Sequence, residues 1–275
     1  GAVPFTAELL EVCPDLKIVL YAAGTTKHLI TDAFRRTGAK LCSAVHLNAV
    51  PVAEFTLGII LTSLKDVFVC HQNFLTRGRA AWTPPRRGYT GGYFHTKIGL
   101  VGFGEISKRL MELLKNFEMD VYIASNYVTP QEEAYYGVRK ASLDFIMTNC
   151  DVVSIHSANV PRNHNLINKD NLKLMKKGAR LINTARGVIV NTGDLTEKLS
   201  EGEITAYLDV TDPEPLPEGH PLYSMENCII TPHASGSCGK EVHRMSEYCL
   251  RELLNWLEGR PLENEIQIDD LAEKT

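Results

Sequence analysis

Apolar residues recur along this chain in two spacings that predict two kinds of element. Short apolar runs bounded by polar or turn residues predict strands, whereas apolar residues three or four positions apart predict helices. We expect strands at residues 17–21, 39–44, 97–101, 120–124, 152–156, 180–183, 205–209 and 228–231. We expect helices at residues 6–12, 30–37, 52–76, 106–117, 142–147, 169–174, 193–200 and 240–257.

Strands and helices alternate from residue 97 onward, which predicts an α/β fold with a Rossmann-type, doubly wound parallel sheet. Before that point, residues 77–96 are rich in turn-forming residues, including Pro84-Pro85 and Gly91-Gly92. Such a segment is typical of a link between domains. We therefore expect one domain over residues 78–237 and a second built from residues 1–77 and 238–275, with the last helix packing back on the N-terminal part.

The composition is that of an ordinary globular protein. The 275 residues are 44% hydrophobic and 23% charged, and the net charge of −4 gives no reason to expect nucleic acid as a partner. Seven cysteines are scattered without a CxxC pair, which argues against a zinc site and favours a reducing, cytoplasmic location. No uninterrupted apolar run approaches the roughly 18 residues of a membrane span, so we expect no membrane partner.

One turn has the spacing of a phosphate-binding loop. The predicted strand 97–101 runs directly into the segment Gly102–Ser107, with the sequence GFGEIS, which opens a helix. Glycines let the backbone turn sharply and approach a pyrophosphate, and the amino end of the helix attracts the anion. This context predicts dinucleotide contacts at Gly102, Gly104, Glu105 and Ile106, although an ordinary tight turn has the same pattern.

The residues after the next strand bear on the choice of cofactor. A carboxylate about 20 positions after such a turn commonly binds the adenosine ribose of NAD. Here strand 120–124 ends instead in Ser125-Asn126, and no arginine adjoins these residues in the sequence to bind a 2′-phosphate. The sequence is therefore compatible with NAD or NADP, with a slight preference for NAD.

Four segments carry a resemblance to a known family. They are residues 48–54 (NAVPVAE), 175–187 (MKKGARLINTARG), 208–217 (LDVTDPEPLP) and 231–236 (TPHASG). In this order and spacing they resemble the D-isomer-specific 2-hydroxyacid dehydrogenases, in a divergent form close to the glyoxylate/hydroxypyruvate reductases. The resemblance covers nearly the whole chain and implies a nucleotide-binding domain inserted into a flavodoxin-like substrate domain. The chain begins part-way into the family pattern, so we expect an incomplete substrate domain.

The resemblance also implies roles for particular residues. Arg186 would bind the carboxylate and carbonyl of a 2-keto acid, His233 would exchange the proton, and Glu214 would partner His233. Backbone groups of Ala23, Gly24 and Thr25 would help to hold the substrate carboxylate. The residues implied to contact the cofactor are Gly102, Gly104, Glu105, Ile106, Ser125, Asn126, Ser157, Ala158, Thr184, Ala185, Arg186, Asp209, His233 and Gly236, with Asp209 beside the nicotinamide.

These residue types suit the implied chemistry. Hydride transfer to a keto carbon leaves a developing alkoxide that needs a proton, and histidine changes protonation near neutral pH. A carboxylate on the other ring nitrogen fixes the tautomer, and arginine presents a planar fork to an anionic acid. The expected function is an NAD(P)-dependent oxidoreductase acting on a small 2-hydroxy or 2-keto acid, without a metal.

Several alternatives remain open at this point. The chain could be a catalytically silent, dinucleotide-sensing regulatory protein, or it could oxidise formate or phosphite on the same fold. An L-2-hydroxyacid dehydrogenase is disfavoured, because its dinucleotide turn would stand at the N-terminus. The apolar residues of the predicted helix 52–76 exceed what one buried face needs, so we expect a homodimer, with a purely intramolecular core helix as the alternative. The sequence does not identify the particular 2-hydroxy acid.

Overall fold

The computed structural model describes residues 3–82 and 91–268. Within it the chain forms two compact units: the residues up to Pro51 together with those from Gly236 form unit 1, and Val52–Ser235 form unit 2. Unit 2 is thus an insertion between the two halves of unit 1. The domain limits expected at residues 77 and 238 stay a prediction, and the turn residues Pro84 and Pro85 lie outside the described residues.

Unit 2 is built on a seven-stranded sheet in which every pairing is parallel. Its strands are β3 (Lys97–Val101), β4 (Asp120–Ala124), β5 (Arg139–Lys140), β6 (Val152–Ile155), β7 (Arg180–Asn183), β8 (Thr205–Leu208) and β9 (Cys228–Ile230). The order β5-β4-β3-β6-β7-β8-β9 runs outward in both directions from the β3–β6 pair, as in a Rossmann-type sheet. The predicted doubly wound fold is confirmed.

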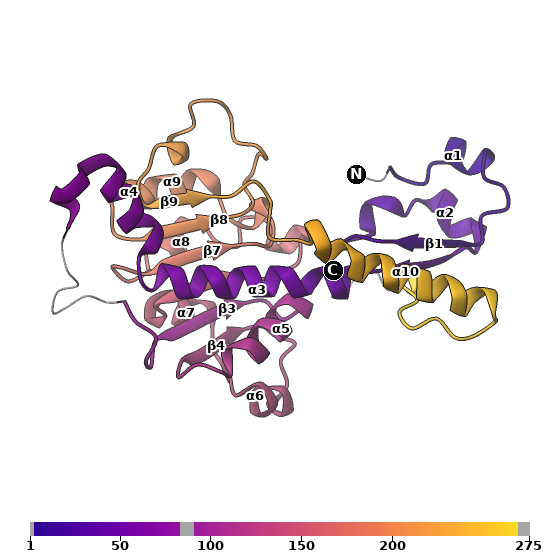
Figure 1. Ribbon diagram of the computed structural model, residues 1–275, viewed down its shortest axis with the longest axis horizontal. Coiled ribbons are helices and arrows are strands. Elements are labelled where there is room, and N and C mark those ends of the chain that lie inside the picture. Colours follow the sequence, from indigo (N-terminus) through magenta and orange to yellow (C-terminus); the bar gives the residue numbers. More distant parts are fainter. Residues whose placement is uncertain (1–2, 83–90, 269–275) are drawn as a thin grey trace. The chain divides into compact units, whose positions relative to one another are not determined.

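Helices cover both faces of this sheet (Figure 1). The elements are α3 (Val45–Ser63), α5 (Glu105–Leu114), α6 (Pro130–Tyr136), α7 (Leu143–Asn149), α8 (Lys169–Leu172) and α9 (Thr192–Ser200). On one face, Ile60 of α3 and Leu110 of α5 are fully buried in a cluster with the strand residue Ile98. On the other face, Met147 of α7 and Leu195 of α9 join a second buried cluster. The large apolar area removed from water on each face stabilises the sheet between its helices.

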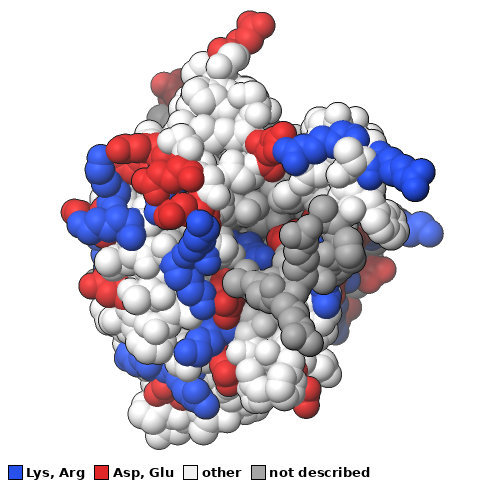
Figure 2. Space-filling model, turned by 90° about the vertical axis from the view of Figure 1, so that its left-hand side faces the viewer, with Lys and Arg blue, Asp and Glu red and all other residues white. Residues whose placement is uncertain are grey.

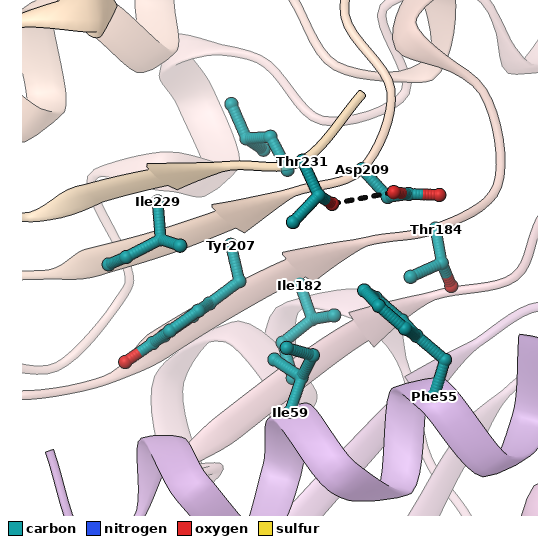
Figure 3. A pocket seen from close by; sticks show the side chains of 9 residues that line it. Phe55, Ile59, Ile182, Thr184, Tyr207, Asp209, Ile229 and Thr231 are labelled. Atoms are coloured by element: carbon teal, nitrogen blue, oxygen red, sulfur yellow. Dashed lines mark hydrogen bonds between the residues drawn. The ribbon is translucent and has the colours of Figure 1, made fainter. Parts of the chain in front are cut away.

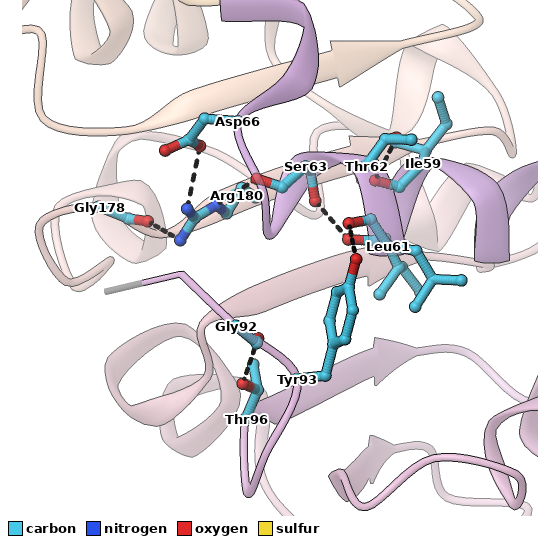
Figure 4. Close-up of polar contacts among 11 residues, drawn as sticks. Ile59, Leu61, Thr62, Ser63, Asp66, Gly92, Tyr93, Thr96, Gly178 and Arg180 are labelled. Atoms are coloured by element: carbon cyan, nitrogen blue, oxygen red, sulfur yellow. Dashed lines mark hydrogen bonds and ion pairs between the residues drawn. The ribbon is translucent and has the colours of Figure 1, made fainter. Parts of the chain in front are cut away.

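The prediction of a single helix over residues 52–76 is wrong. The structure has α3 and a separate helix α4 (Val67–Arg77), divided at Asp66, whose backbone is left-handed with φ of 48°. The cause is a tertiary contact (Figure 4): the buried Arg180 guanidinium donates to the Asp66 carboxylate at 3.1 Å, to the Ser63 carbonyl at 3.3 Å and to the Gly178 carbonyl at 2.7 Å. A buried arginine needs such partners, and here they include the end of α3.

Unit 1 contains the parallel pair β1 (Ile18–Tyr21) and β2 (Lys40–Ser43). Around it lie α1 (Ala7–Glu11), α2 (Asp32–Thr37) and α10 (Val242–Leu257). Helix α10 packs against both strands, as predicted for the last helix. Short 3-10 turns elsewhere in the chain cover Lys27–Leu29, Gly78–Ala81, Pro161–Asn163, Gly187–Ile189, Pro221–Tyr223 and Gly239–Glu241.

Among the described residues, α3 is the one helix long and apolar enough to cross a membrane by length and composition, with a mean hydropathy of 1.4. Core helices of globular proteins pass the same test, and α3 contributes Ala53 and Ile60 to the buried cluster on the sheet. On the face shown in Figure 2, basic and acidic side chains lie interspersed.

Candidate active site

The polar residues implied by the family resemblance gather where the strands of unit 2 end. Arg186 follows β7, Glu214 follows β8 and His233 follows β9. Since neighbouring parallel strands end at the same edge of a sheet, the three loops lie at one carboxyl edge, where doubly wound folds bind their ligands.

His233 and Glu214 form the central contact of this edge. The imidazole Nδ1 lies 2.6 Å from the Glu214 carboxylate oxygen Oε1, and the two side chains are 48% and 42% exposed. With Nδ1 engaged, Nε2 is the ring nitrogen that can exchange a proton with a bound molecule. The backbone at His233 is left-handed, with φ of 53°, and its N–H donates to the Asp209 carbonyl at 2.9 Å. A non-glycine residue in this region is held there by its surroundings.

Asp209 holds the loop that carries His233. Its carboxylate accepts hydrogen bonds from the Thr231 hydroxyl at 2.5 Å, the Ala234 N–H at 2.8 Å and the Ser235 N–H at 3.0 Å. Burial by itself would raise the pKa of Asp209, but the hydrogen bonds of Ser235, Thr231 and Ala234 outweigh it and the pKa is lowered. The side chain is therefore an ionised acceptor inside the structure.

The turn that carries Arg186 is fixed by its neighbours. The Asn183 side chain accepts from the Ala185 N–H at 3.1 Å and donates to the Arg186 carbonyl at 2.9 Å. Gly187 lies so close to the loop after β8 that a Cβ would stand 1.9 Å from the Thr211 carbonyl oxygen. Only glycine fits there, so the loops after β7 and β8 are in close backbone contact beside Arg186.

An apolar hollow lies between α3 and the ends of β7, β8 and β9 (Figure 3). It is lined by Phe55, Ile59, Ile182, Thr184, Tyr207, Leu208, Asp209, Ile229 and Thr231. The Thr184 hydroxyl contacts the Thr56 hydroxyl of α3 at 3.1 Å, and both residues are buried. Helix α3 therefore supports the segment that leads to Arg186, a role that the sequence did not suggest.

The glycine turn after β3 approaches the neighbouring strand closely and is open on its other side. Gly102 has φ of 108°, and a Cβ there would lie 2.6 Å from the His156 carbonyl oxygen. A Cβ on Gly104 would meet nothing within 4 Å, so that side of the turn is open to a ligand. Ser107, in place of a third glycine, is buried and accepts from the Gly104 N–H at 2.8 Å. With Glu105 and Ile106 in the first turn of α5, these residues fit a dinucleotide phosphate group.

His156 closes the strand next to this turn and is buried. Its Nε2 pairs with the Ser154 hydroxyl at 3.0 Å, and burial lowers its pKa to about 4. The imidazole is therefore neutral at neutral pH, which argues against a role as proton donor. The Ser157 hydroxyl donates to the Val101 carbonyl at 3.2 Å, and Ala158 is exposed.

The end of β4, where the sequence predicts contacts with the adenosine, lies beside a residue that the sequence analysis did not single out. Ser125 and Asn126 follow β4 as predicted, and the Ser125 hydroxyl oxygen accepts from the Tyr127 N–H at 3.2 Å. The Tyr127 hydroxyl in turn accepts from the Arg162 guanidinium at 2.9 Å. Arg162 stands 35 positions later in the chain, so no local sequence pattern could have placed it here.

The remaining predicted site residues belong to unit 1. The Ser43 hydroxyl donates to the Gly24 carbonyl at 2.9 Å, and the Ser237 N–H, next to Gly236, donates to Asn48 Oδ1 at 2.9 Å. The roles predicted for Ala23, Gly24, Thr25 and Gly236 stay predictions. Among the residues that the structure describes, no group of three or more His, Cys, Asp or Glu is placed to hold a metal ion.

Fold and site together define a dinucleotide-binding α/β protein with an acid–base pair at the sheet edge. The sequence model of the D-isomer specific 2-hydroxyacid dehydrogenase NAD-binding domain matches residues 57–235. The chain is 34% identical over 259 residues to a glyoxylate reductase of Thermofilum pendens, covering 92% of this chain and 75% of that protein. It is 28% identical over 257 residues to the human glyoxylate reductase/hydroxypyruvate reductase, covering 92% and 78%.

Solved structures share the fold of this chain. The TT0316 protein from Thermus thermophilus superposes with a TM-score of 0.79 at 33% identity, covering 94% of this chain and 82% of that one. A D-lactate dehydrogenase with NAD+ from Lactobacillus jensenii has the same fold, with a TM-score of 0.83 at 21% identity and coverage of 97% and 84%. The chain belongs to the D-isomer-specific 2-hydroxyacid dehydrogenase family.

Proposed function

We propose that this chain reduces small 2-keto acids to D-2-hydroxy acids with NAD(P)H. The observation that carries the proposal is the His233–Glu214 pair, 2.6 Å apart at the carboxyl edge of the sheet, on the same edge as Arg186. An acid–base group and an anion-binding group on neighbouring loops are what the reduction of a keto acid requires.

Each residue has a defined part in the proposed reaction. A bound nicotinamide supplies the hydride that the keto carbon accepts. The Arg186 guanidinium binds the substrate carboxylate and orients the carbonyl. The protonated His233 gives the proton on Nε2 to the carbonyl oxygen as the hydride arrives, and Glu214 keeps the imidazole oriented through Nδ1. In the reverse direction His233 takes the proton back from the hydroxyl group.

Asp209 acts as a positioning residue in this proposal. The sequence resemblance places it beside the nicotinamide, but its carboxylate is occupied by Thr231, Ala234 and Ser235. It therefore serves the reaction by holding the loop on which His233 stands.

Glyoxylate and hydroxypyruvate are the substrates that we propose first, because the relatives with 34% and 28% identity to this chain are named for them. The cofactor is NAD(H) or NADP(H), bound at the turn from Gly102 to Ile106.

We also propose a cytoplasmic homodimer. The seven cysteines are all free, as expected in a reducing compartment. Helix α4 and the turn after it present apolar side chains to the surface: Val67, Phe68, Phe74, Leu75 and Trp82 are each at least 38% exposed. The apolar residues of α3 are largely used inside the unit, since Ile59 and Ile60 are buried, so α4 is the better candidate for the contact.

The direct test is the loss of NADH or NADPH absorbance with a panel of 2-keto acids. We expect turnover of glyoxylate or hydroxypyruvate by the wild type. Arg186→Lys keeps the charge but removes the planar fork, so we expect a higher KM for the acid. Nucleotide binding without turnover of any acid would contradict the proposal and favour a sensing protein.

A further inference from the structure

The adenosine end of the nucleotide site carries a basic side chain from a second loop. Arg162 lies in the short turn Pro161–Asn163 after β6, and its guanidinium donates to the Tyr127 hydroxyl at 2.9 Å. Tyr127 follows β4, two residues after Ser125. Because β4 and β6 flank β3 on either side, the contact joins the loops on both sides of the strand that leads into Gly102.

The charges around this contact favour an anion. Arg162 is exposed, and among the described residues no carboxylate lies within 4.0 Å of its guanidinium to form an ion pair. The acidic residues of the neighbouring helix α6 have other partners. Glu132 accepts from the Thr129 N–H at 2.9 Å, and Glu133 accepts from the Lys140 N–H at 2.5 Å. Both carboxylates stay charged, but neither forms an ion pair with Arg162, whose positive charge stands beside the hydroxyl groups of Ser125 and Tyr127.

We propose that Arg162 binds the 2′-phosphate of NADP(H), which makes NADP(H) the preferred cofactor. The inference rests on the nucleotide site of the proposed function. Ser125 stands where a carboxylate would repel that phosphate, and its hydroxyl oxygen accepts from the Tyr127 N–H, which leaves the hydroxyl proton to donate. The guanidinium uses one donor on Tyr127 and keeps others for a phosphate.

A competing role for Arg162 is stacking on the adenine ring. Stacking would strengthen the binding of adenosines with and without a 2′-phosphate alike, because both carry the same ring. A contact with the 2′-phosphate strengthens only the binding of adenosines that carry this group. The ratio of the two affinities therefore separates these roles.

The test is calorimetric titration of the full chain with adenosine 2′,5′-bisphosphate and with AMP, neither of which can react. We expect the wild type to bind the bisphosphate roughly tenfold more tightly, the size of one charge-assisted hydrogen bond. Arg162→Ala should abolish this difference and leave AMP affinity unchanged, whereas Arg162→Lys should keep part of it. Ser125→Asp should reverse the preference, because it places a negative charge beside the 2′ position.

The matched control is Arg139→Ala, which removes an exposed arginine that also donates to a tyrosine, Tyr122, at 3.1 Å. It should leave both affinities unchanged. Equal affinities of the wild type for adenosine 2′,5′-bisphosphate and AMP would overturn the inference and leave the proposed function standing. An equal loss of affinity for both ligands in Arg162→Ala would do the same. Binding of neither ligand would overturn the nucleotide site and the proposed function together.

Discussion

At the end of β8, one carboxylate organises the loop after β9 that carries His233. Asp209 binds the Thr231 hydroxyl and the N–H groups of Ala234 and Ser235, and its own backbone carbonyl accepts from the His233 N–H. The left-handed backbone of His233 is stabilised by these bonds on both sides. The orientation of the His233 imidazole toward Glu214 thus depends on Asp209, which need not touch the substrate.

The lowered pKa of Asp209 makes a prediction about stability and pH. Because the folded state lowers this pKa, the stabilising contribution is present above the unfolded value of about 3.9 and is lost as the pH falls through the folded pKa. We expect Asp209→Asn to lower the urea midpoint at neutral pH. The gap between variant and wild type should narrow below about pH 4. A gap that stays constant across this range would show that the ionised carboxylate is not the stabilising form.

At the scale of the elements, buried apolar strands were the predictable part of the fold. The strands at 97–101, 120–124 and 180–183 begin and end as predicted, because short runs buried on both faces leave a continuous apolar signal. β5 was missed, since Arg139 and Lys140 are exposed and carry no such pattern. α6 was missed although its signals are present: Thr129 and Glu132 form a capping box with Pro130 between them.

The residues of the candidate site also include some that the sequence could predict and some that it could not. The strand-end positions of Arg186, Glu214 and His233 follow from the sequence, because each sits in a recognisable segment after a strand. The approach of Arg162 to Tyr127 and of Arg180 to Asp66 depends on segments distant in the chain. Such pairs become neighbours only through the tertiary fold, which local patterns do not encode.

The contact between the β7 and β8 loops can be tested with a glycine pair. In Gly187→Ala the new Cβ would stand 1.9 Å from the Thr211 carbonyl oxygen, so backbone must move, at a cost of about 1–3 kcal/mol in unfolding free energy. Gly58→Ala, inside α3 with nothing within 4 Å of its Cβ, should instead stabilise by roughly 0.5–1 kcal/mol. Urea unfolding of both variants measures the contrast. Equal effects would refute the close approach.

At the scale of the whole molecule, the exposed apolar side chains of α4 predict self-association. Sedimentation equilibrium should give twice the chain mass of 30.6 kDa. The double change Phe74→Glu and Leu75→Glu should yield monomers, because each side chain is at least 40% exposed and its charge would be buried at the contact. Leu250→Glu, at another exposed leucine, should leave the mass unchanged. A wild-type monomer would contradict the dimer.

In the proposed reaction His233, held by Glu214, gives the proton to a 2-keto acid. The most direct measurement is kcat/KM with glyoxylate for the wild type and for His233→Asn, a replacement that tolerates the left-handed backbone at this position. We expect kcat/KM to fall by about 10²–10⁴-fold while the nucleotide affinity stays unchanged. A variant that binds nucleotide and turns over glyoxylate as fast as the wild type would contradict it.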